Sequence, residues 1–189
     1  MKIGGIDEIL DKATEIIALN GIEHFSLSIL AKALNMNKAS LYHYFPSKEV
    51  MMEELHDKAH ERLMKKGYRL SLDGSFEKAI TSLIHHWEEI YFSDESYNYM
   101  RLLLSMRVTD ERALEEYRSI EEMLYAQSDV VFSYYESKGE IEKKPLSSRL
   151  FSALIKSELE RGLIENESGD IESLIRELCI TLTRGKELR

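Results

Sequence analysis

Residues 26–48 read SLSILAKALNMNKASLYHYFPSK and contain two short helical patterns separated by a turn. Ser26 can cap the first helix, because its hydroxyl can accept a hydrogen bond from a backbone N–H of the first turn. Asn35 tolerates the positive φ of a tight turn, and Asn37 can cap a second helix that runs to about Tyr44. Two short helices joined in this way predict a helix-turn-helix, a motif that places its second helix in the major groove of DNA.

Further helices are predicted on both sides of this motif. Apolar residues recur at helical spacing over residues 6–20, where Asn20 and the glycine after it favour the left-handed turn that ends a helix. Pro46 ends the second helix of the motif, and Ser47 can cap a long helix over about residues 47–66. We therefore expect a three-helix unit followed by a long helix that leads into the rest of the chain.

The remainder of the chain has the pattern of a larger helical domain. Only two prolines occur in 189 residues, and the sequence contains no strand pattern, repeat or low-complexity segment. Breaks rich in Gly, Ser, Asn or Asp divide the chain beyond the long helix into about five helices. The predicted fold is all-α with about nine helices. It comprises a helix-turn-helix DNA-binding domain at residues 1–48 and a helical effector-binding and dimerisation domain at residues 49–189.

Charge is distributed unevenly along the chain. The formal net charge is −9, with 34 acidic residues among 189, yet the 25 residues from His24 to Lys48 include no Asp or Glu. The same window contains three lysines and two histidines. Carboxylates are thus absent from the helix-turn-helix of an otherwise acidic protein, which predicts a surface that faces a polyanion. The alternative is a buried segment that is simply poor in polar residues.

The most specific part of the motif is LYHYFPSK at residues 41–48, which directly follows KAS at residues 38–40. Together with its flanking helices, over about residues 6–55, it resembles the DNA-binding domain of the TetR family of transcriptional regulators. Asn35 stands where that family usually has a turn glycine, and Ala39 where a recognition-helix glycine is frequent. The resemblance implies a one-component regulator: an all-helical homodimer whose N-terminal domain binds DNA and whose larger domain binds a ligand.

The spacing within the second helix of the motif separates inward from outward side chains. Leu41 and Phe45 are four residues apart, so they share one face and should pack on the neighbouring helices. The first residues of a recognition helix reach base edges, whereas Tyr, His and Ser side chains suit phosphate oxygens. The resemblance also implies a phosphate contact at Lys48, in the first turn of a helix that attracts anions. The alternative is a buried Tyr42 and a merely solvated Lys48. The predicted DNA-contacting residues are Ser26, Lys38, Ala39, Ser40, Tyr42, His43 and Lys48.

Aromatic residues are concentrated in the middle of the chain. Twelve of the seventeen aromatic residues lie between residues 68 and 135, with several methionines among them. A cavity lined by such residues would suit a flat or apolar ligand, with tyrosine hydroxyls to orient it. The alternative is that they form an ordinary core. The predicted effector-pocket residues are Trp87, Tyr91, Tyr99, Met100, Met106, Tyr117, Tyr125 and Phe132.

The last two predicted helices have strong apolar stripes. Two neighbouring helices of this kind can form half of an intersubunit bundle in a symmetric dimer. The predicted interface residues are Leu150, Leu154, Leu174, Leu178 and Leu182. The single cysteine, Cys179, lies in the same apolar pattern and is expected to be a buried structural thiol.

Metal binding and catalysis have little support in the sequence. Glu53, His56 and His60 could place three metal ligands on one helix face, with His85 and His86 as distant complements, but helices carry such residues by chance. No nucleophile elbow, P-loop, dinucleotide fingerprint or metalloprotease helix is present, so neither an enzyme nor a cofactor is expected.

The function predicted from these features is a cytoplasmic transcriptional repressor that binds double-stranded operator DNA as a homodimer. A small apolar or aromatic effector is expected to relieve this binding. One alternative is a DNA-binding regulator without a small-molecule effector, and another is an all-α metal-dependent enzyme. The cytoplasmic location is expected because the N-terminus has no apolar signal region and charges interrupt every later apolar stretch.

Overall fold

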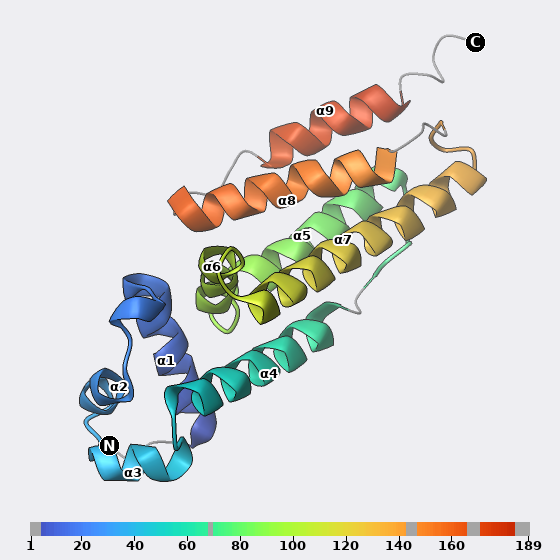
Figure 1. Ribbon diagram of the computed structural model, residues 1–189. Helices are drawn as coiled ribbons and strands as arrows, with labels where there is room; N and C mark the ends of the chain where they lie inside the picture. The colour runs from blue at the N-terminus through green and yellow to red at the C-terminus, as the bar shows by residue number, and fades with distance from the viewer. Residues whose placement is uncertain (1–4, 68–69, 143–146, 166–170, 184–189) are drawn as a thin grey trace. The chain divides into compact units, whose positions relative to one another are not determined.

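The computed structural model describes residues 5–67, 70–142, 147–165 and 171–183, which form nine α-helices and one short 3-10 helix and contain no strand (Figure 1). The predicted all-α fold with an N-terminal helix-turn-helix is therefore confirmed. The helices are α1 (Ile6–Asn20), η1 (Ile22–His24), α2 (Leu27–Ala33), α3 (Lys38–Tyr44), α4 (Lys48–Gly67), α5 (Phe76–Phe92), α6 (Tyr97–Met106), α7 (Glu111–Ser137), α8 (Ser147–Glu165) and α9 (Ile171–Thr183).

Local interactions define the ends of the helix-turn-helix. Ser26 Oγ accepts a hydrogen bond from the Ile29 backbone N–H at 3.3 Å, and Asn37 Oδ1 accepts one from the Ala39 N–H at 2.9 Å. Between the two helices Asn35 has a φ of 52°, the left-handed conformation that Asn tolerates better than most residues. The caps and the turn predicted from the sequence are all confirmed.

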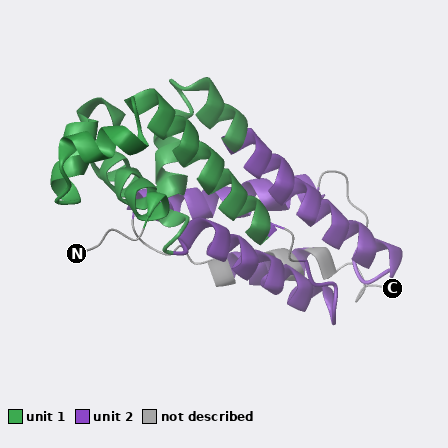
Figure 2. Ribbon diagram, turned by 90° about the horizontal axis from the view of Figure 1, so that it is seen from below, with its two compact units in different colours: residues 1–66, 94–116 green, residues 67–93, 117–189 purple. Residues whose placement is uncertain are grey.

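Contacts within the chain divide it into two compact units, shown in different colours in Figure 2. Unit 1 consists of residues 1–66 and 94–116, and unit 2 of residues 67–93 and 117–189. Helix α6 belongs to unit 1 because it packs along α1. The sequence predicts a functional boundary between residues 48 and 49, with DNA binding before it and effector binding after it. These contacts do not test that boundary, which stays a prediction.

The core of unit 1 joins the helix-turn-helix to α4 and α6. Apolar side chains from all of these helices are almost completely shielded from solvent, which removes their area from water and favours one packed arrangement. The main core residues are Ile9, Leu10, Ala13, Ile17, Leu30, Leu41, Phe45, Met51, Leu55, Leu102 and Leu103.

The core of unit 2 is aromatic. The ring of Phe132 on α7 lies 5.2 Å from that of Phe76 and 5.4 Å from that of Phe151, measured between centroids, and Phe151 in turn lies 5.8 Å from Trp87. Helix α5 packs against both α8 and α9. None of the described helices is long and apolar enough to cross a membrane.

Candidate nucleic-acid interface

Helix α3 presents one buried and one exposed face. Leu41 and Phe45 are fully buried, as their spacing predicted. Tyr42 is 42% exposed, which contradicts the alternative that it belongs to the core. The side chains of Lys38, Ala39, Ser40 and His43 are exposed as well. Tyr44, which was not predicted as a contact, is also exposed on α3. All five outward residues of the predicted contact set therefore lie at the surface of unit 1 on a single helix.

Two of these side chains contact each other. The Lys38 ammonium lies 5.6 Å from the centroid of the Tyr42 ring, one helical turn further on, within the range of a cation–π interaction. Such a contact orients both side chains away from the core without using the Tyr42 hydroxyl. No carboxylate occurs in residues 24–48, so nothing on this segment repels a phosphate.

Ser26 is partly committed to its helix cap. Its oxygen accepts the Ile29 N–H, but a hydroxyl can accept and donate at the same time. The Ser26 proton therefore remains available to an external acceptor such as a phosphate oxygen.

Lys48 has partners that the sequence did not predict. Its ammonium donates to the carbonyl oxygen of Ile22 at 2.8 Å and to that of Phe25 at 3.4 Å, and it lies 5.8 Å from the centroid of the Phe25 ring. The lysine thus ties the start of α4 to the connection between α1 and α2. An ammonium has three N–H donors, so one remains for a phosphate.

The aromatic residues predicted to line one pocket are distributed over both units. Trp87, Tyr91 and Phe132 are buried in unit 2, and Tyr117 and Tyr125 are half-buried there. The other three members, Tyr99, Met100 and Met106, are buried in unit 1. Phe151 contacts both Trp87 and Phe132 but was not in the predicted set, because it lies outside the aromatic-rich segment.

Each unit contains a hollow among its described residues. A cleft of about 790 Å³ in unit 1 is lined by parts of α1, α4 and α6, including Leu10, Arg62 and Tyr99. A groove of about 430 Å³ in unit 2 lies between α7 and α8, and Tyr125 lines it with the Arg149 guanidinium 4.6 Å from its ring centroid. Of the predicted pocket residues, Tyr99 lines the first and Tyr125 the second.

Helix α8 has an apolar face that unit 2 leaves uncovered. Leu150 is 59% exposed and Leu154 is 46% exposed, while Phe151 and Ile155 beside them are fully buried. Ile164, which was not predicted, extends the same exposed set. On α9, Leu174 is half-buried, and the side chains of Leu178, Cys179 and Leu182 lie outside the described residues.

The histidines considered as metal ligands have different environments. His56 is buried and contacts residues of α6 and α7, whereas His60 is exposed. The described part of the chain contains no group of three or more His, Cys, Asp or Glu side chains arranged to hold a metal ion.

An exposed recognition helix on a capped helix-turn-helix, in a segment free of carboxylates, defines the class of helix-turn-helix DNA-binding proteins. Residues 9–55 match the model of a family described as bacterial regulatory proteins, tetR family. The N-terminal part of the chain is thus similar to the DNA-binding domain of this family of transcriptional regulators.

Solved structures share the fold over nearly the whole chain. PfmR from Thermus thermophilus, a TetR family transcriptional regulator, is 21% identical, with a TM-score of 0.70 over 95% of this chain and 96% of that chain. A TetR transcription regulator from Haloarcula marismortui is 14% identical, with a TM-score of 0.69 over 94% and 97%. GusR from Salmonella enterica is 18% identical, with a TM-score of 0.63 over 95% of each chain. No curated protein sequence matches the chain.

Proposed function

We propose that the chain is a homodimeric repressor whose two α3 helices bind the half-sites of an operator. The observation that carries this proposal is the exposed face of α3, where Lys38 and Tyr42 project from a segment without carboxylates. The residues proposed to contact DNA are those predicted from the sequence, with Lys38, Ala39 and Ser40 nearest to the bases and Ser26, Tyr42, His43 and Lys48 at phosphates. An operator can be recovered by selection from random DNA duplexes with the full-length protein.

Lys48 is proposed to have two roles, one in holding the helices together and one in binding a phosphate. Two measurements on a single substitution separate these roles. Lys48→Met keeps the apolar stem but removes the donors to the Ile22 and Phe25 carbonyls, so unfolding should become easier by about 1 kcal/mol and Tm should fall by about 2–4 °C. If the third ammonium hydrogen contacts a phosphate, the slope of log affinity against log salt should also shrink by about 0.9.

Thermal melts and operator titrations at several salt concentrations measure both effects. Lys65→Met, on an exposed lysine of the same helix, serves as the control and should change neither. A lower Tm with an unchanged salt slope would mean that Lys48 only holds the helices together.

The proposed effector is a small apolar or aromatic molecule that binds in unit 2 and weakens operator binding. This proposal is supported by the aromatic content of the unit and by the groove at Tyr125. The stacking of Trp87, Phe132 and Phe151 supports the alternative of an ordinary core in a regulator without such an effector. One experiment distinguishes the two.

Trp87 is the only tryptophan, and its Nε1–H donates to Gln127 Oε1 at 2.7 Å, so its emission reports on the interior of unit 2. In a screen of aromatic and aliphatic acids and alcohols, an effector should change this emission and raise Tm, because a ligand of the native state stabilises it. The same compound should lower operator affinity by roughly 5- to 150-fold. Trp87→Phe should lose the emission change but keep the Tm shift. A compound that stabilises the protein without affecting operator binding would support a pocket but not a switch.

A further inference from the structure

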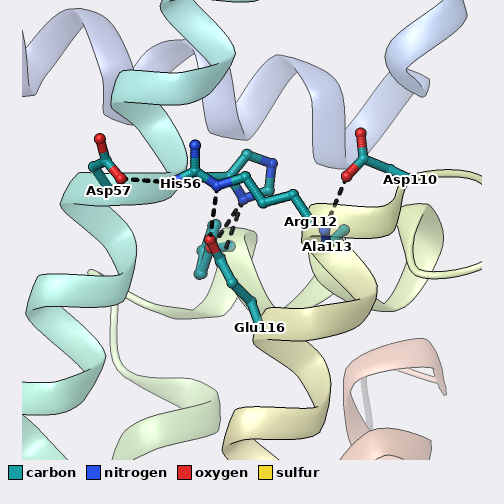
Figure 3. A network of polar contacts seen from close by, with 7 residues as sticks. His56, Asp57, Asp110, Arg112, Ala113 and Glu116 are labelled. Atoms are coloured by element: carbon teal, nitrogen blue, oxygen red, sulfur yellow. Dashed lines mark hydrogen bonds and ion pairs between the residues drawn. The ribbon is translucent and has the colours of Figure 1, made fainter.

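A buried histidine joins three helices of unit 1. His56, on α4, is only 3% exposed. Its Nδ1 lies 3.1 Å from the Tyr99 hydroxyl on α6 and 3.3 Å from Glu116 Oε2 on α7 (Figure 3). Glu116 and Tyr99 are themselves buried, so little water competes for these contacts.

The same carboxylate is held by a second pair of residues. Glu116 Oε1 accepts a hydrogen bond from Arg112 Nε at 3.3 Å, and the Arg112 guanidinium also donates to Asp57 Oδ1, next to His56 on α4 (Figure 3). Helix α4 is therefore joined to α7 through two adjacent residues. Asp110 Oδ1 accepts the Ala113 N–H at 2.8 Å, which caps the start of α7.

Directional contacts of this kind select one position of a helix. Apolar surfaces between helices tolerate small sliding movements. In contrast, the folded state is strongly destabilised when a buried carboxylate loses a partner. The arrangement in which His56, Tyr99 and Arg112 all reach their partners is thus favoured over nearby positions of α4.

Helix α4 contacts the helix-turn-helix through its first residue. It begins at Lys48, which is tied to the connection between α1 and α2, and its residues Met51 and Leu55 are buried in the core of unit 1. His56 follows Lys48 by eight residues, about 12 Å along a helix. A displacement of α4 at His56 would move the helix-turn-helix with it.

Helix α7 continues beyond Glu116 into unit 2. The next residue, Tyr117, donates its hydroxyl to Glu160 Oε1 on α8 at 2.8 Å and accepts a hydrogen bond from Lys156 Nζ at 2.6 Å. Glu116 thus binds α4 while its neighbour binds the helix proposed to form the dimer interface. Consecutive residues of one helix carry both sets of contacts.

We infer that His56 and Glu116 are positioning residues for operator binding, which fix α4 and thereby determine the spacing of half-sites that the dimer accepts. The inference rests on the proposed function of a dimer with two α3 helices. Dimers of helix-turn-helix proteins bind half-sites at defined distances, and each base pair changes the distance by about 3.4 Å.

The test measures affinity for the selected operator and for versions with one base pair inserted or deleted at its centre. His56→Leu removes the hydrogen bonds at similar volume, and His56→Asn keeps a polar group near the position of Nδ1. His60→Leu, on an exposed residue of the same helix, is the matched control.

Wild-type protein should bind the altered operators about tenfold or more weakly than the original. His56→Leu should reduce this ratio to about threefold or less, while His56→Asn and His60→Leu should largely retain it. A role in stability alone would weaken binding to all three operators equally. If His56→Leu does not fold, Glu116→Gln, which preserves the shape of the side chain, should lower the ratio in the same way.

Two outcomes would overturn the inference, and they differ in meaning. If wild type discriminates between spacings and the folded variants discriminate equally well, His56 and Glu116 do not position α4. If wild type shows no spacing preference, the proposed binding of a dimer to two half-sites fails together with the inference.

Discussion

Lys38→Glu is expected to weaken operator binding by at least about 100-fold, equivalent to about 2.8 kcal/mol. Lys38 lies in the first turn of α3, on the exposed face, and its ammonium is close to the Tyr42 ring. The substitution removes the proposed phosphate or base contact and introduces a carboxylate into a segment that has none. Like charges brought together at an interface cost several kcal/mol.

Lys78→Glu provides the control for net charge. Lys78 is an exposed residue of α5 in unit 2, and its substitution changes the total charge by the same amount. Fluorescence anisotropy with the selected operator should show nearly wild-type binding for Lys78→Glu at physiological salt. Equal losses in both variants would indicate that overall charge, rather than the α3 face, governs binding.

Features that depend on neighbouring residues could be predicted from the sequence. The caps at Ser26 and Asn37 and the positive φ at Asn35 arise within a few residues of chain, where side-chain chemistry dictates backbone geometry. Leu41 and Phe45 are buried because their spacing of four places them on one helix face. The caps of α2 and α3, the turn between them and the buried face of α3 were therefore predictable from the sequence.

Contacts between distant segments could not be predicted in this way. The spacing of His56 and His60 suggested a shared metal site, but spacing reports only neighbours on the same helix. The partners of His56 are 43 and 60 residues away on α6 and α7, and those of Lys48 lie 26 and 23 residues earlier. Which distant residues become partners depends on how the helices pack against one another.

The aromatic-rich segment illustrates the same limit. The high density of aromatic residues in this segment placed Tyr99 and Trp87 in one predicted pocket. The two residues lie in different compact units, because α6 packs along α1. Phe151, outside the segment, completes the ring contacts around Trp87. Composition identifies which residues are apolar enough for a core. Which of them come into contact depends on which helices pack against one another.

The double substitution Leu150→Glu/Leu154→Glu is expected to convert a dimer into a monomer at micromolar concentration. Both leucines are exposed on α8, so the charges should be tolerated in the folded monomer. In a dimer formed through this face the carboxylates would be buried without partners, at a cost of about 3–5 kcal/mol for an unpaired charge. Dissociation should therefore increase by at least about 100-fold.

Sedimentation velocity measures the oligomeric state. The control is Val130→Glu, which changes an exposed apolar residue of α7 and should remain dimeric. The monomeric variant should also lose operator affinity even though α3 is unchanged, because each chain would then bind one half-site alone. If the wild-type chain sediments as a monomer, the proposed dimer is wrong. If the double variant stays dimeric, the interface lies elsewhere, and the exposed leucines of α8 need another explanation.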